Sequence, residues 1–381
     1  MPTSSGQSLL ASKSAQRWEK IRTFTGHSFL FAVTAASAMG ILFIIAFIFK
    51  DAMPFFSAQG ITAIFEGAEW YPTEDPGSFK ALGIIWGSIL VTLGSGLMAV
   101  PIGITAAVCL SDILPFGVRQ VVKPVIELLA AIPSVAYGFF ALVVFAPLLQ
   151  NHGGTLLTVA LWILMGPVVL LAAVILSELA TTKLEGARRK YGRPAATVAI
   201  TLGGFWLLYV GSTHVTALEI TSGVNALNAS IWLAVMALPT VVSVCEDSLT
   251  AVGRDLREGS YALGSTRAET ITRVVIPAAK GGILAGVLLG IMRAIGETMV
   301  VLMAAGNAIE VPKPMYNLLA PVRTLTATIA IEMAEVDHTT KGPHYRALFA
   351  LAFFLLCFAF ICNVVSEWSV RRTRKKLQGL K

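Results

Sequence analysis

Charged side chains are scarce in this sequence. Of its 381 residues only 13% are Asp, Glu, Lys or Arg, whereas 55% are hydrophobic, and the mean hydropathy is +0.74. A water-soluble domain of this length cannot bury that much apolar surface. The composition therefore predicts an all-α fold, a polytopic helical membrane protein embedded in a lipid bilayer.

Cysteines and catalytic motifs are also few. The sequence has no phosphate-cradling GxxxxGK[ST] motif, no HExxH and no GxSxG, and its five histidines are scattered. No pair of cysteines forms Cys-x-x-Cys, so neither a disulfide framework nor a zinc site is indicated, and we expect small buried thiols. The four are Cys109, Cys245, Cys357 and Cys362. We expect no catalytic residue, no bound metal and no cofactor in this chain, and any ATP to be hydrolysed by a partner.

The net charge of +7 does not indicate a nucleic-acid partner. The basic residues lie in short runs beside apolar stretches, which is the pattern of cytoplasmic loops. Residues 1–27 and the tail at 371–381 are both basic, so we expect both termini in the cytoplasm. The apolar run at 28–49 could be a signal peptide, but it is long and KDAMP follows where a small-residue cleavage site should be. We therefore expect a retained first span.

About eight apolar runs are long enough to cross a bilayer. They are residues 28–49, 81–110, 124–149, 155–178, 195–216, 221–249, 279–305 and 346–370. Together they define a transmembrane domain at 28–370. An outer loop at about 307–345 contains a predicted short helix with exposed Glu332 and Glu335, which is either a surface for a periplasmic partner or a solvated capping helix.

The stretch at 255–277 is the most polar part of the second half of the chain. Asp255 precedes Glu258 by three residues and Thr266 precedes Glu269 by three, and both pairs fit the capping box of a helix start. Gly264 falls between them, where a left-handed C-cap is wanted. Pro277 disfavours helical geometry at the residue before it. The pattern predicts two short helices with a sharp turn, which could be an ordinary connector.

The spacing within this stretch resembles the cytoplasmic "EAA" loop of ABC-importer permeases. The matching positions are Glu258, Gly259, Ser260, Gly264, Ile276 and Pro277. Gly259 and Ser260 stand where the family has alanines. The resemblance implies that residues 255–277, called the coupling segment below, dock into a groove on a separate ATPase subunit.

Two opposite charges lie inside the penultimate apolar run. Arg293 and Glu297 are one helical turn apart on one predicted helix face, and intramembrane ionisable residues normally face a bundle interior or an aqueous path. An ion pair that merely fixes helix packing is one interpretation. The other is that Arg293 presents its guanidinium to a tetrahedral oxyanion, while Glu297 orients it or gates release.

The phrase Arg-Ala-Ile-Gly-Glu-Thr-Met at 293–299 resembles that of phosphate-specific ABC permeases, and Gly306-Asn307 beyond it resembles their C-type subunit. ELLAAIPSVAYGFFAL, from residue 127 onward, is similar to the same family's wording. The resemblance covers roughly 28–150 and 220–370. It implies a non-catalytic transport subunit with Arg293, Glu297 and Thr298 on the substrate path. Pro133, Ser134 and Pro239 are implied in kinked helices beside that path.

The same resemblance also implies a function, a location and a set of partners. The chain would form half of the translocation path of an ATP-driven importer for inorganic phosphate in a bacterial inner membrane. Its partners would be a homologous A-type permease, an ABC ATPase dimer and a periplasmic phosphate-binding protein. The alternatives are an importer of phosphonate, sulfate, molybdate or tungstate, an ion-coupled secondary transporter, and a membrane-embedded enzyme.

Residues 155–216 have no counterpart in the six-span pattern of that family. They consist of two apolar runs joined by the basic stretch TTKLEGARRKYGRP, which the positive-inside rule places in the cytoplasm. An inserted helical hairpin preserves the orientation of everything after it. We expect either a lipid-facing addition or a subunit contact.

Overall fold

A computed structural model describes residues 13–74, 76–181 and 187–378. The elements are, in order, α1 (Lys13–Gln59), η1 (Thr62–Phe65), β1 (Trp70–Tyr71), β2 (Ser78–Phe79), α2 (Leu82–Val108), η2 (Cys109–Ile113), α3 (Phe116–Ala131), α4 (Ser134–Phe140), η3 (Ala141–Phe145), α5 (Ala146–Thr181), α6 (Ala187–Thr216), α7 (Ala226–Thr250), α8 (Arg254–Ala262), α9 (Arg267–Thr270), η4 (Ile271–Val275), α10 (Ile276–Ile295), α11 (Met299–Ala304), α12 (Leu325–Glu335) and α13 (Pro343–Gln378). The predicted all-α class is confirmed.

The described chain divides into two compact units. The first comprises the chain up to Ile61 together with Asp337–Phe354. Its buried Asp51 accepts hydrogen bonds from Lys341 Nζ at 3.0 Å and from the Tyr345 hydroxyl at 2.9 Å. Phe47 meets Phe349 edge-on next to this cluster. These contacts join α1 to the start of α13.

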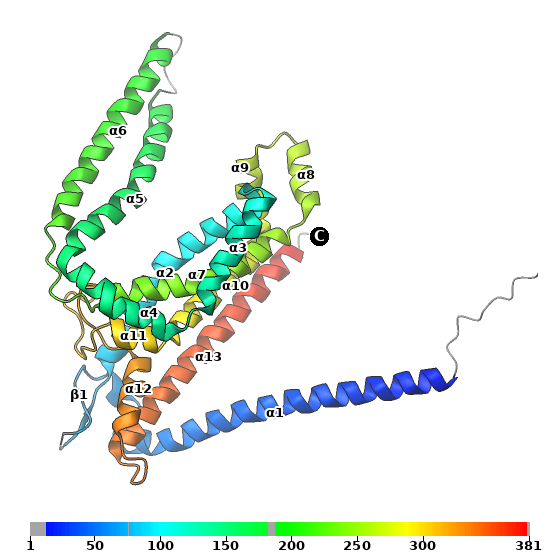
Figure 1. Cartoon of the computed structure of the whole chain (residues 1–381), viewed down its shortest axis with the longest axis vertical. Coiled ribbons are helices and arrows are strands. Elements are labelled where there is room, and N and C mark those ends of the chain that lie inside the picture. The colour runs from blue at the N-terminus through cyan, green and yellow to red at the C-terminus, as the bar shows by residue number, and fades with distance from the viewer. Residues whose placement is uncertain (1–12, 75, 182–186, 379–381) are drawn as a thin grey trace, which may run out of the picture. The chain divides into compact units, whose positions relative to one another are not determined.

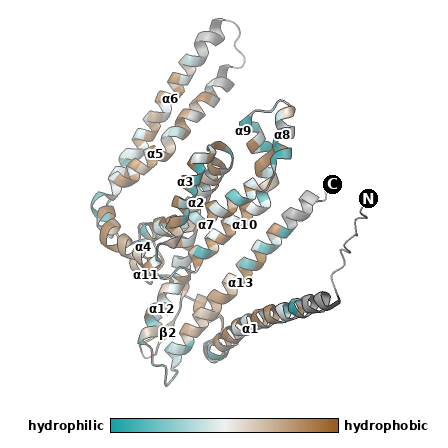
Figure 2. Cartoon of the chain, turned by 45° about the vertical axis from the view of Figure 1, so that its right-hand side comes forward, coloured by the Kyte–Doolittle hydropathy of each residue, from teal (hydrophilic) through white to brown (hydrophobic). Residues whose placement is uncertain are grey.

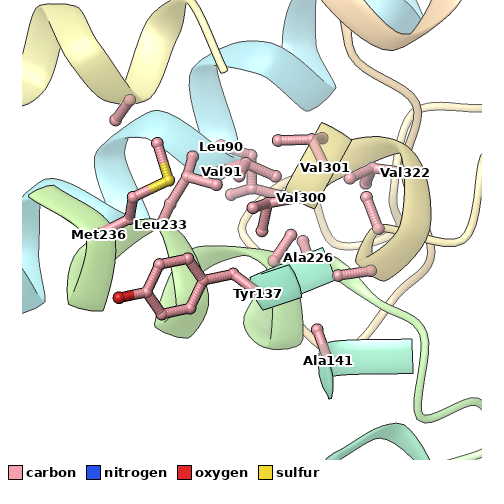
Figure 3. Packing of buried hydrophobic residues seen from close by; sticks show 14 residues of the cluster. Leu90, Val91, Tyr137, Ala141, Ala226, Leu233, Met236, Val300, Val301 and Val322 are labelled. Atoms are coloured by element: carbon pink, nitrogen blue, oxygen red, sulfur yellow. The ribbon is translucent and has the colours of Figure 1, made fainter. Parts of the chain in front are cut away.

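The second unit comprises Thr62–Val336 and the chain from Leu355 onward. Its centre is α7, against which α2 and α10 pack (Figure 1). Small and branched side chains from α2, α7 and α11 form the main cluster, with Tyr137 of α4 at its edge (Figure 3). Because α2 and α10 both pack against it, α7 is the most buried of the candidate spans among the described residues.

Seven helices in the described residues are long and apolar enough to cross a membrane, whereas we expected about eight. The difference arises at 134–174, where the expected third span and the first limb of the hairpin lie on one helical run. Within it, His152 has non-helical backbone angles, φ −130° and ψ 18°. The run therefore bends there without a loop that would separate two spans.

The expected single span at 124–149 is wrong. Ile132 and Pro133 have extended backbone angles, so α3 ends at Ala131 and α4 begins at Ser134. The physical reason is the proline, which disfavours helical geometry at the residue before it. We expected a kink at Pro133, and the helix breaks completely.

Three glycines of α10 face α7, and their four-residue spacing leaves one face of the helix open for close contact. A Cβ added at Gly282 would lie 2.0 Å from Ser248 Oγ, and one added at Gly290 would lie 2.4 Å from Val241 Cγ2. A Cβ at Gly286 would lie 2.9 Å from Cys245 Sγ. The two helices therefore touch closely along this stripe, and larger side chains cannot be accommodated without separating them.

Gly290→Val is expected to destabilise the protein by about 2 kcal/mol or more, since overpacking a tight contact forces backbone shifts. The measurement is thermal aggregation of the detergent-solubilised chain. Gly203→Val is the matched control, because nothing lies within 4 Å of a Cβ at that α6 position. Equal stability of the two variants would contradict the close packing of α10 on α7.

The segment that contains α12, between α11 and α13, is held by a buried carboxylate. Glu332 of α12, expected to be exposed, is only 7% exposed. It accepts hydrogen bonds from Trp70 Nε1 of the small β1–β2 hairpin at 2.8 and 2.9 Å and from Arg323 Nη1 at 2.9 Å. These donors compensate for its desolvation. Glu335 is exposed, as expected.

The residues of the expected hairpin form α5 and α6, which run side by side (Figure 1). Trp162 stacks on Phe205 between them, with ring centroids 5.7 Å apart. Trp206 and Tyr209 are exposed. Lys183 and Glu185 of the predicted cytoplasmic turn lie outside the described residues. Of the four cysteines only Cys245 is buried, and the other three, predicted to be buried, are half-buried.

Candidate translocation path and coupling segment

The coupling segment forms two short helices, α8 and α9. Thr266 and Glu269 form the predicted capping box, with Thr266 N donating to Glu269 Oε2 at 2.9 Å. Gly264 has φ +83°, the left-handed conformation expected at a helix C-terminus. The first capping box was predicted wrongly: α8 begins at Arg254 after Gly253, so Asp255 lies inside the helix.

The coupling segment exposes both polar and large apolar side chains. Glu258 and Gly259 are exposed on α8. Leu263, beside the turn, is 88% exposed, and Leu256 and Tyr261 are also exposed. Figure 2 shows hydrophilic residues gathered at α8 and α9, next to the hydrophobic span α10. Large apolar groups displayed within a polar surface are typical of a protein-binding surface.

Ser260 and Thr270 hold α8 against α9. Both are buried, and their hydroxyl oxygens lie 2.9 Å apart. Ser260 is thus an internal contact of the coupling segment, whereas Glu258, Gly259 and Gly264 lie on its surface. Of these predicted residues, Ser260 therefore stabilises the fold of the segment, whereas the other three are exposed on its surface.

Pro277 does not interrupt the helix, contrary to our prediction. Ile276 is right-handed helical, and Pro277 falls in the first turn of α10, where its missing N–H is tolerated. The π-helical turn η4 joins α9 to α10 without a break. Helix therefore continues from Arg267 to Ile295, so the coupling segment is joined rigidly to a membrane span.

Asp112 in η2 is a contact of the coupling segment that the sequence did not reveal. Its carboxylate accepts from Arg257 Nε of α8 at 3.0 Å, and its backbone carbonyl accepts from Arg267 of α9. The only signal in the sequence is an acid at the end of an apolar run. The pairing itself joins residues 145 positions apart.

Arg293 and Glu297 are not on one helix. The predicted span at 279–305 is interrupted, because α10 ends at Ile295 and α11 begins at Met299. The Glu297 carbonyl accepts from Thr326 Oγ1 at 2.8 Å, a tertiary bond, and Gly296 is a weak helix former at the break. No ion pair joins Arg293 to Glu297 in the part of the chain that the structure describes. The prediction that both residues lie on one face of one helix is therefore wrong.

The Arg293 guanidinium is exposed, and its one described hydrogen bond is a long one to the Thr240 hydroxyl of α7, at 3.4 Å. Glu297 lines a small hollow together with hydroxyl groups from α2 and the start of α12. The lining residues are Ser88, Val91, Thr92, Leu233, Ala294, Ile295, Glu297, Val301, Thr324 and Thr326. Arg293 thus has no anionic partner among the described residues, while Glu297 faces neutral hydroxyls.

Thr298 is half-buried and precedes α11. At the break between α3 and α4, the Tyr137 hydroxyl donates to the Leu129 carbonyl at 2.7 Å. Figure 3 shows this hydroxyl pointing away from the apolar cluster. Pro239 is buried within α7, which runs unbroken through it. The structure therefore places Pro133 and Ser134 at a helix break and Pro239 inside a continuous helix.

Glu246 near the end of α7 ties α3 in place. It is fully buried and accepts from Lys123 Nζ at 2.6 Å and from Arg119. Lys123 also reaches Asp247 at 3.2 Å. The hydrogen bond to Glu246 raises the pKa of the Lys123 ammonium. This cluster fixes the N-terminal half of α3 against the central helix.

Residues 99–375 match the family described as the inner-membrane component of binding-protein-dependent transport systems. The chain belongs to this family. As a member, it is a multi-pass membrane protein of a class of transport components, in agreement with its seven candidate spans. The matched range includes the coupling segment, Asp112 and Arg293, so every element of the candidate site except residues 82–98 of α2 lies within the family's common region.

Several curated relatives align over most of this family member. It is 30% identical over 309 residues to the probable ABC transporter permease protein YqgH of Bacillus subtilis, covering 80% of this chain and 77% of the relative. It is 31% identical over 304 residues to the phosphate transport system permease protein PstC of Mesorhizobium japonicum, covering 80% and 76%. The PstC of Pasteurella multocida is 28% identical over 321 residues, covering 84% and 83%.

Proposed function

We propose that this chain is the C-type permease subunit of an ATP-driven importer of inorganic phosphate. The observation that carries the proposal is the Arg293 guanidinium, exposed at the end of a membrane span with only a long bond to a neutral hydroxyl. A cation buried for packing alone would be paired. An arginine held open in this way can bind a phosphate oxyanion through two parallel N–H donors. The names of the PstC relatives support phosphate as the anion.

The proposal includes three partners. An ABC ATPase dimer would bind Leu256, Glu258 and Leu263 on the coupling segment and would consume the ATP, leaving this chain without a cofactor or catalytic residue. A homologous A-type permease would complete the path. A periplasmic phosphate-binding protein would deliver substrate to the outer face, near α12. Both termini would lie in the cytoplasm of a bacterium, with the chain in its inner membrane.

The mechanism proposed here involves no covalent chemistry in this chain. Closure of the ATPases would displace α8 and α9, and the continuous helix to Ile295 would carry that movement to Arg293. Phosphate bound by Arg293, next to Glu297 and Thr298, would be released toward the cytoplasm. The helix break at Pro133–Ser134 and the buried Pro239 of α7 would flank the path.

The function is tested by uptake of radiolabelled phosphate in cells that lack other phosphate importers. Expression of the chain with its three partners is expected to restore uptake, and excess unlabelled phosphate to compete with it. Sulfate, molybdate and phosphonate in the same excess are expected to compete at least about tenfold less well, which corresponds to about 1.4 kcal/mol of discrimination. Uptake of another oxyanion in place of phosphate by an assembled complex would overturn the substrate assignment.

A further inference from the structure

The end of α2 that leads into η2 is held against the coupling segment by the ion pair of Asp112 with Arg257, called the clamp below, in which the Asp112 side chain is only 7% exposed. Arg257 of α8 donates to both carboxylate oxygens of Asp112, from Nε at 3.0 Å and from Nη2 at 3.4 Å. Ser111 Oγ also donates to Asp112 Oδ2, at 2.7 Å. A forked, charge-assisted contact of this kind fixes direction as well as distance.

The same guanidinium also reaches the end of α7. Arg257 Nη2 donates to the Leu249 carbonyl at 2.9 Å, and Nη1 donates to the Gly253 carbonyl at 2.8 Å. Gly253 has φ +81° and precedes α8. The covalent connection from α7 to α8 thus passes through a glycine turn, and Arg257 braces α8 across that turn.

The clamp is shielded from water. The side chains of Arg257 and Asp112 are 17% and 7% exposed, whereas those of the surface pair Lys80 and Glu69 are 39% and 63% exposed. Salt and solvent therefore weaken the Asp112–Arg257 contact less than an ordinary surface ion pair.

The helices joined at the clamp are those that shape the candidate path. Ser88 and Thr92 of α2 line the hollow beside Glu297. Thr240 of α7 bonds Arg293. The coupling segment continues as unbroken helix into α10, whereas a glycine turn separates it from α7 and no direct chain connection joins it to α2. Movement of the coupling segment therefore reaches α2 and α7 through side-chain contacts.

We propose that Asp112 and Arg257 are positioning residues that transmit the movement of the coupling segment to α2 and α7, so that ATP hydrolysis is coupled to substrate movement. The inference rests on the proposed function for its ATPase partner. It assigns a role to two residues outside the Glu258–Pro277 spacing and outside the Arg293 path. Without the clamp, α8 remains docked on the ATPase but pivots at Gly253 while α2 and α7 stay behind.

The test uses the complete complex of both permeases, the ATPase and the binding protein in proteoliposomes. Asp112→Ala, Arg257→Ala and the double variant are compared with wild type for ATP hydrolysis and for phosphate imported. We expect hydrolysis to change less than about twofold, and phosphate imported per ATP to fall at least about tenfold in each single variant. The double variant is expected to be no worse than Arg257→Ala, because Arg257→Ala already removes the contact with Asp112.

Two further variants serve as controls. Lys80→Ala breaks the exposed pair with Glu69 and is expected to leave the ratio of phosphate to ATP unchanged. Arg257→Lys keeps the charge but loses the two parallel N–H donors, and it replaces Arg257→Ala if Arg257→Ala does not co-purify with the ATPase. For Arg257→Lys we expect a ratio of phosphate to ATP between those of wild type and Arg257→Ala. A wild-type ratio in both Asp112→Ala and Arg257→Lys would overturn the proposal.

A second readout does not depend on the identity of the substrate. The native cysteines of the chain are removed, and spin labels are attached at position 97, the exposed Leu97 of α2, and on the ATPase. The distance between the labels reports the displacement of α2 when ATP is added to the complex. The displacement is expected in the wild-type sequence and lost with Arg257→Ala. Its persistence in the variant would refute the clamp. Failure of wild type to import phosphate would instead count against the proposed function.

Discussion

Replacing Arg293 with alanine is expected to abolish phosphate uptake while the complex remains assembled. The guanidinium makes one long bond, to Thr240, so its removal strands no buried partner. A hydrogen bond to a charged group contributes about 1.5–3 kcal/mol. Loss of one such bond from Arg293 to the phosphate should lower the uptake rate at least about tenfold, and loss of two parallel bonds should lower it further.

The measurement is radiolabelled phosphate uptake, with membrane abundance and ATPase co-purification determined on the same cells. Arg293→Lys is the informative companion, because it keeps a positive charge without the planar fork, and partial uptake is expected. Arg371→Ala, at an exposed position on α13, is the control for loss of an arginine charge elsewhere. Normal uptake by an abundant Arg293→Ala variant would remove Arg293 from the path.

Glu258→Arg is expected to prevent binding of the ATPase without unfolding the permease. Glu258 is exposed on α8, and no hydrogen bond or ion pair within the described chain depends on it. The substitution leaves the buried Ser260–Thr270 contact intact but reverses a charge beside Leu256, on the surface proposed to enter the ATPase groove. Placing the wrong charge in such an interface costs several kcal/mol.

ATPase co-purification with the tagged permease measures this effect directly, and at least a tenfold reduction is expected. Glu335→Arg introduces the same charge reversal on α12, outside the coupling segment, and should leave co-purification unchanged. If Glu258→Arg retains the ATPase at the wild-type level, the docking surface lies elsewhere on the chain.

The sequence predicted features whose causes are local. The second capping box and the left-handed Gly264 depend on residues within a few positions of one another, and both are present. Hydropathy alone was enough to assign the membrane class, because a bilayer requires long apolar helices.

The features that the sequence did not predict depend on tertiary contacts. Thr326 takes the Glu297 carbonyl from a position 29 residues away, which accompanies the break in the helix between Arg293 and Glu297. The partner of Asp112 lies 145 residues along the chain. Glu332 was expected in solvent because its donors, Trp70 and Arg323, are not adjacent to it in sequence. Periodicity and capping rules contain no information on such pairs.

The unbroken helix from Arg267 to Ile295 has the geometry of an unequal lever. Its tightest contact with α7, at Gly282, Gly286 and Gly290, lies well toward the Arg293 end. At 1.5 Å per residue, the arm from Gly286 to Arg267 is about 28 Å long and the arm to Arg293 is about 10 Å long. With the glycine contact as fulcrum, a displacement of the coupling segment relative to α7 would arrive at Arg293 in the opposite direction and reduced roughly threefold. A large stroke at the proposed ATPase surface would thereby be converted into a small, forceful one at Arg293.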